Sequence, residues 1–75
     1  MTTHEKRHLI RALHAYRQGE GHRGDYQLWV GFGDDWTLFK AKLIRDGYLN
    51  DAKRSDSMLT DRGNGLLARF EPAAA

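Results

Sequence analysis

The first apolar positions of the chain repeat every three or four residues, the spacing of one face of an α-helix. These positions are Leu9, Ile10, Leu13 and Tyr16. Thr2 and Glu5 precede them at the spacing of a capping box, in which each side chain accepts from the other residue's backbone amide. The pattern predicts a helix over residues 3–18. The next segment, GEGHRG at 19–24, predicts a flexible connector, because glycine loses much backbone entropy in a helix.

Residues 25–33 fit two patterns. Alternate positions in this stretch are apolar, as in a strand that buries one face. Asp25 is equally suited to cap a short helical turn that would bury Tyr26, Trp29 and Val30. Two glycines near the end of the stretch keep either element short. A short helix or turn is the preferred interpretation, and the strand stays open as the alternative.

A further amphipathic helix is predicted over residues 34–46. Asp34 or Asp35 is a suitable N-cap, because a carboxylate accepts from the free amides at the positive end of a helix. Gly47 follows at the position where a left-handed residue commonly ends a helix. The predicted inner face consists of Trp36, Phe39, Leu43 and Ile44.

After this helix the pattern changes to short apolar pairs on either side of a polar loop. Residues 48–51 and 57–59 predict two short strands around the loop AKRSD. A final helix is predicted over residues 60–70, with Thr60 or Asp61 as its cap. Its apolar side chains fall on one side and are Leu66, Leu67 and Phe70.

A helix, a glycine stop, a hairpin and a helix in succession resemble the second half of a winged helix-turn-helix DNA-binding domain. KLIRDGYL resembles a recognition helix entering the wing, and MLTDRG resembles the second wing strand turning into the closing helix. The resemblance covers residues 34–70, and the helix at 3–18 fits the first helix of that fold. It implies an α+β fold, a compact three-helix winged helix with a small antiparallel β-hairpin wing. Residues 1–71 would form a single domain of this kind, and residues 72–75 a disordered tail.

Charge is distributed unevenly along the 75 residues. Residues 1–24 carry five cations, two anions and all four histidines, whereas the remainder carries seven cations and eight anions. No cysteine is present, which excludes disulfides and thiolate metal sites. The N-terminus is charged from the start, and no apolar run is long enough for a signal peptide or a membrane span. We therefore expect a cytoplasmic protein that does not engage membranes.

The resemblance implies binding to double-stranded DNA, as in many small bacterial and phage transcription regulators. Winged-helix domains usually place the third helix in the major groove and the hairpin over phosphates. In this sequence, carboxylates stand close to the cations of the predicted third helix and hairpin, and they would meet phosphate unfavourably. On this chain the implied DNA contacts are Thr37, Lys40, Lys42, Arg45, Lys53 and Arg54.

The alternative prediction is a protein-binding winged-helix module, such as a phage-type inhibitor that docks on a host nucleic-acid-processing complex. One basis for it is the basic N-terminal part of the chain. The other is the group Trp29, Phe32 and Trp36, three large aromatic residues within eight positions, which form either core or a partly exposed patch for a partner or a homodimer. The predicted surface consists of Arg7, Arg11, Arg17, Arg23, Trp29 and Phe32.

Catalytic and metal chemistry find little basis in the sequence. His4 and His8 share one helix face, but two ligands without a third do not make a zinc site. The GEGHRG segment follows a helix and lacks the pattern of a phosphate-binding P-loop. No nucleophile has an evident base. We expect no enzyme activity, no metal and no cofactor.

Overall fold

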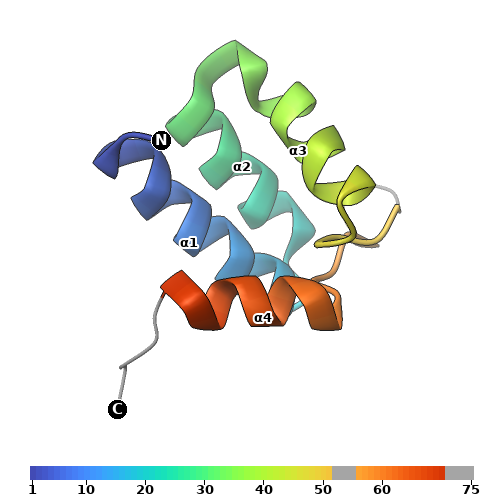
Figure 1. Ribbon diagram of the computed structural model, residues 1–75. Helices are drawn as coiled ribbons and strands as arrows, with labels where there is room; N and C mark the ends of the chain where they lie inside the picture. Colours follow the sequence, from blue (N-terminus) through green and yellow to red (C-terminus); the bar gives the residue numbers. More distant parts are fainter. Residues whose placement is uncertain (52–55, 71–75) are drawn as a thin grey trace.

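The protein was analysed as a computed structural model, which describes residues 1–51 and 56–70. α1 and α2 lie side by side and antiparallel, α3 lies beyond α2, and α4 crosses α1 (Figure 1). In these residues the order of elements is α1 (Thr3–Arg17), α2 (Gly21–Phe32), the 3₁₀ turn η1 (Gly33–Asp35), α3 (Trp36–Arg45) and α4 (Asp61–Phe70).

A single cluster of buried side chains joins the four helices. Partly buried rings and aliphatic side chains, among them Phe39, Ile44 and Phe70, pack around it. This agrees with the predicted inner faces of α1, α3 and α4. The buried members are Leu9, Ala12, Leu13, Tyr16, Leu28, Leu43, Leu49 and Leu67.

The helix predicted over residues 3–18 is confirmed as α1, and so is its capping box. Thr2 Oγ1 accepts from the backbone N–H of Glu5 at 3.1 Å, and the backbone N–H of Thr2 donates to Glu5 Oε1 at 2.8 Å. The hydrogen bond from the Thr2 backbone lowers the pKa of the Glu5 carboxyl, because it stabilises the ionised form.

The flexible connector predicted over residues 19–24 is wrong, because α2 already begins at Gly21. Gly24 lies inside this helix against α1, and a Cβ there would stand 2.5 Å from Cε1 of the Tyr16 ring. The glycine therefore serves close packing of two helices. The strand alternative for residues 25–33 is also wrong. The helix expected there is confirmed and is longer than predicted, but it leaves Tyr26 and Trp29 exposed.

The predicted α+β fold, a three-helix winged helix with a β-hairpin wing, is wrong for the described part of the chain. Residues 48–51 and 57–59 form no strands there, only one isolated antiparallel bridge between Leu49 and Leu59. The backbone N–H of Met58 donates to the side-chain Oδ1 of Asn50 at 2.7 Å instead of to a backbone carbonyl, so the ladder does not extend. The described residues form a helical protein, with α2 as the additional helix.

The C-cap predicted at Gly47 is confirmed. Its φ is +87°, and the backbone N–H groups of Gly47 and Tyr48 donate back to Ile44 at 3.0 Å and Leu43 at 2.9 Å. These two bonds form a Schellman motif, which satisfies carbonyls at the end of α3. Thr60 Oγ1 donates to the Gly47 carbonyl at 2.5 Å and accepts from the N–H of Gly63 at 3.0 Å. Thr60 therefore ties the start of α4 to the end of α3, as well as capping α4 as predicted.

Gly47→Val is expected to lower the free energy of unfolding by about 1 kcal/mol or more, because a branched side chain resists a positive φ. Gly47→Asn is the matched control, since asparagine tolerates this conformation better than other side chains. Urea unfolding of the three proteins measures the effect. Equal urea midpoints for Gly47→Val and the unmodified protein would show that the left-handed cap is not required.

Candidate functional site

Lys40 was predicted to contact DNA, but it lies inside the protein. Its Nζ is 2.8 Å from Oδ1 of Asp25, and the two side chains are only 12% and 5% exposed. The same carboxylate oxygen accepts from the hydroxyl of Tyr16 at 2.5 Å, and Lys40 Nζ lies 5.6 Å from the centre of the Tyr16 ring. The three side chains link α1, α2 and α3. The charge of Lys40 is therefore balanced within the chain.

The other predicted DNA contacts of α3 are exposed. Thr37, Lys42 and Arg45 lie on its outer face, together with Leu38, which is 72% exposed. Arg45 Nε is 3.7 Å from a carboxylate oxygen of Asp46. This surface is weakly basic and partly apolar. Lys53 and Arg54, the remaining predicted contacts, lie outside the described residues, as does the tail predicted over residues 72–75.

The exposed side of α1 carries several cations. Arg7, Arg11 and Arg17 are exposed, and none of them forms an ion pair with a residue that the structure describes. Arg7 and Arg11 stand four residues apart on one face, an arrangement of like charges that costs a helix a few tenths of a kcal/mol. Arg17, farther along α1, donates from Nη2 to Nδ1 of His14 at 3.0 Å.

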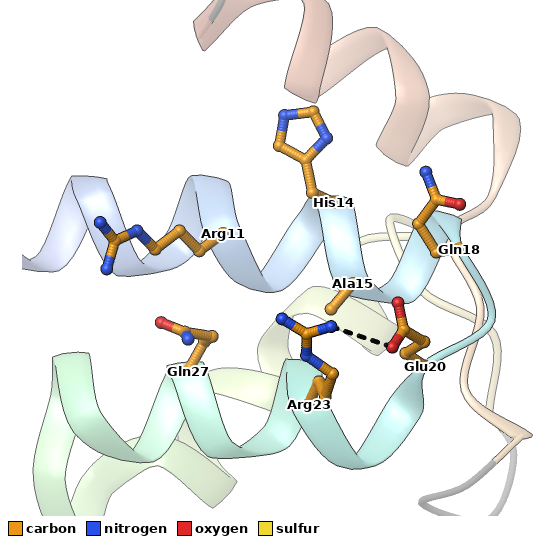
Figure 2. A pocket seen from close by; sticks show the side chains of 7 residues that line it. All are labelled: Arg11, His14, Ala15, Gln18, Glu20, Arg23 and Gln27. Atoms are coloured by element: carbon orange, nitrogen blue, oxygen red, sulfur yellow. Dashed lines mark hydrogen bonds and ion pairs between the residues drawn. The ribbon is translucent and has the colours of Figure 1, made fainter.

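A groove of about 460 Å³ runs between α1 and α2 beside these arginines. Arg11, His14 and Gln18 line it from α1, and Arg23 and Gln27 rise toward it from α2 (Figure 2). Its floor includes the small side chain of Ala15. The groove is thus lined by guanidinium, imidazole and amide groups, which are suited to oxygen-rich anions, and by one carboxylate, that of Glu20.

The short turn after α1 creates this groove. Gly19 has a φ of +78°, and the backbone N–H of Glu20 donates to the carbonyl of Ala15 at 2.8 Å, so the chain reverses direction within residues 18–20. Glu20 supplies the groove's carboxylate, 3.2 Å from Nη1 of Arg23. This pair is exposed, so it restrains Arg23 weakly and leaves its other donors available.

Two contacts hold the far ends of α1 and α2 together. His8 Nδ1 lies 2.8 Å from Oε1 of Gln27, and His4 Nε2 lies 3.3 Å from the carbonyl of Val30. The two rings also contact each other edge to face, with centroids 4.6 Å apart. These histidines position the helices. No group of three potential metal ligands was found among the described residues.

The aromatic residues of the predicted partner surface separate into two kinds. Phe32 stacks on Phe39 with ring centroids 4.1 Å apart, and so belongs to the edge of the core. Trp29 is 50% exposed and lies beside Tyr26, which is 58% exposed. Tyr26 was expected to be buried, and no role in a site was predicted for His14, Gln18 or Gln27. For the α1 residues, a polar stripe continuing the spacing of Arg7 and Arg11 was the signal that could have found them.

The chain matches no protein-family model, and no curated protein sequence or solved structure matches it significantly. None of the described helices is long and apolar enough to cross a membrane. The function is therefore inferred from the geometry of the described residues.

Proposed function

We propose that this protein is a non-enzymatic nucleic-acid-binding module that holds a phosphate backbone against α1 and α2. The observation that supports this most is the set of exposed arginines on α1 without ion-pair partners among the described residues. We call Arg7, Arg11 and Arg23, with the groove beside them, the arginine face. The predicted role in transcription regulation remains part of this proposal.

The chemistry of the arginine face suits phosphate. Guanidinium groups donate two parallel hydrogen bonds to phosphate oxygens, and the amides of Gln18 and Gln27 can add neutral donors. Each phosphate that meets a cation releases condensed counterions, and this release supplies most of the non-specific affinity. A bound phosphate chain would also relieve the repulsion between Arg7 and Arg11.

The outer face of α3 is less suited to this task. Lys40 is committed to Asp25, so Lys42 and Arg45 remain as exposed cations. Exposed carboxylates stand at both ends of the helix, at Asp34, Asp35 and Asp46, and would repel phosphate. We therefore assign the main contact to α1 and α2, away from the recognition helix that the sequence resemblance implied.

Salt dependence tests the assignment. Arg7→Ala with Arg11→Ala is expected to weaken binding to a labelled duplex and to reduce the slope of log K against log salt concentration by about 2 units, since each phosphate contact contributes about 0.9. Fluorescence anisotropy over a salt series measures the slope. Alanine favours helix, so the double variant should keep its thermal midpoint.

The matched control is Lys42→Ala with Arg45→Ala, which also removes two exposed cations but from α3. We expect its salt slope to equal that of the unmodified protein. The reverse result, with the α3 variant changing the slope and the α1 variant silent, would place the DNA on α3.

A second candidate function is docking on an acidic protein. Leu38 favours it, because an apolar side chain 72% exposed on α3 suits a protein interface better than a phosphate backbone. Failure to bind any nucleic acid at low salt would overturn the nucleic-acid proposal and leave this one. The arginines would then act mainly by speeding association at low salt.

A further inference from the structure

A second hollow, of about 330 Å³, lies on α2 next to the arginine face. His22, Tyr26 and Trp29 line it from α2, Trp36 lines it from α3, and the buried Asp25 forms part of its floor. Its volume falls at the small end of the range for ligand sites, about 300–1,000 Å³. We call these residues the aromatic pocket.

The exposed rings of the aromatic pocket are not needed by the core. Tyr26 and Trp29 are 58% and 50% exposed, whereas Phe32 on the same helix is packed against Phe39. A small domain gains stability by burying its large rings, so leaving two of them half in water gives up hydrophobic stabilisation. Tyrosine and tryptophan combine an apolar ring with a polar group, which suits a ligand that is flat and partly polar.

The aromatic pocket and the arginine face share α2. Residues 22, 26 and 29 follow one stripe of this helix, and residues 23 and 27 follow the neighbouring stripe, because successive residues are about 100° apart. Arg23 thus lies between the groove and the exposed rings. A polyanion on the arginine face would run past the aromatic pocket.

We infer that the aromatic pocket takes an unpaired nucleobase, so that the protein prefers single-stranded to double-stranded nucleic acid. The inference rests on the proposed function, since the arginine face would hold the backbone of the same strand. Proteins that bind single strands combine a cationic groove with aromatic rings on which bases stack. In this chain α2 contributes to both, with Arg23 lining the groove and Tyr26 and Trp29 lining the aromatic pocket.

The geometry of the rings defines how a base would sit. The centroids of Tyr26 and Trp29 are 6.0 Å apart and the ring planes are inclined by 45°, so the two rings already contact each other. A base therefore stacks on the outer face of one ring instead of inserting between them. Asp25 is 4% exposed and bonded to Lys40 and Tyr16, so it offers little to the edge of a base. Recognition by stacking tolerates any base, and we expect weak sequence preference.

Trp29→Ala tests the inference against a labelled single strand and the duplex formed from it. Loss of a stacked base is expected to weaken binding to the single strand by about 5- to 150-fold. Binding to the duplex should stay unchanged, because bases paired in a helix cannot reach the ring. The salt slope should also stay unchanged, since no cation is removed. The same measurements on Trp29→Phe should retain most of the affinity, because a flat ring remains.

Leu38→Ala is the matched control, because it removes an exposed apolar side chain from the outer face of α3. This variant should leave single-strand binding intact. Trp36→Phe leaves Trp29 as the sole tryptophan, and its fluorescence should then be quenched when the single strand binds. Thermal melts of each variant verify that the fold is kept.

The outcomes separate this inference from the proposed function. If the protein binds both nucleic acids and Trp29→Ala weakens neither, the base site is overturned while the arginine face stands. If no nucleic acid binds, both are overturned. If Trp29→Ala converts a dimer into a monomer in sedimentation and leaves single-strand affinity unchanged, the aromatic pocket joins two copies of the chain, and the base site is again overturned.

Discussion

Lys40→Met is expected to lower the free energy of unfolding by about 3–5 kcal/mol, because it leaves the carboxylate of Asp25 buried without its cation. Met reproduces the lysine side chain as far as Cε, so lost packing contributes little. The total stability of a domain of this size is about 4–11 kcal/mol, so this loss removes a large part of it. Urea unfolding followed by circular dichroism measures the loss.

Two further variants isolate the ion pair. Lys42→Met removes an exposed lysine two positions along the same helix and should change stability by no more than about 0.5 kcal/mol. Asp25→Asn combined with Lys40→Met should recover much of the loss, because the amide oxygen still accepts from Tyr16 and no buried charge remains. If the double variant is no more stable than Lys40→Met, the buried charge is not the cause.

Gly63→Ala is expected to cost about 1–3 kcal/mol through overpacking. A Cβ at this position would lie against the backbone carbonyl oxygen of Tyr48 and 2.6 Å from Cδ1 of Leu59. The carbonyl cannot move without disturbing the hydrogen bond that it accepts from the N–H of Thr60 at 3.1 Å. The substitution therefore separates α4 from the bridge that precedes it. Thermal melts measure the effect.

Gly65→Ala is the control within the same helix. Nothing lies within 4 Å of a Cβ there, and alanine favours helix over glycine by up to about 1 kcal/mol. We therefore expect Gly63→Ala to lower the free energy of unfolding and Gly65→Ala to raise it, although the two identical substitutions stand only two residues apart. If both stabilise the protein, the close approach at Gly63 does not exist in solution.

Local signals were the part of the fold that the sequence could predict. The capping box of α1 and the left-handed end of α3 each depend on a few neighbouring residues, and both were found. The predicted hairpin also rested on a few neighbouring residues, but it does not form as a ladder of strands. The side chain of Asn50 accepts from the backbone N–H of Met58 and stops the ladder. Short apolar pairs cannot reveal such competition between a side chain and a backbone carbonyl.

Contacts between distant segments were the part that could not be predicted. A glycine such as Gly24 suggests a break in a helix unless it is known that the Tyr16 ring occupies the space of its missing side chain. Lys40 likewise resembles any outward lysine of an amphipathic helix until Asp25 is placed beside it. The α1 arginines were correctly predicted to be exposed. The groove next to them could not be predicted, because it depends on how α2 folds back against α1.

The reversal of the chain within residues 18–20 has a consequence for the order in which the protein gains structure. The described side chains that line the groove all come from residues 11–27, so the contacts between them span short stretches of sequence. Closing so short a loop costs little entropy, and chains dominated by such contacts fold in about microseconds to milliseconds. The groove is thus a site of low contact order: among the residues that the structure describes, none of its lining side chains comes from the second half of the chain.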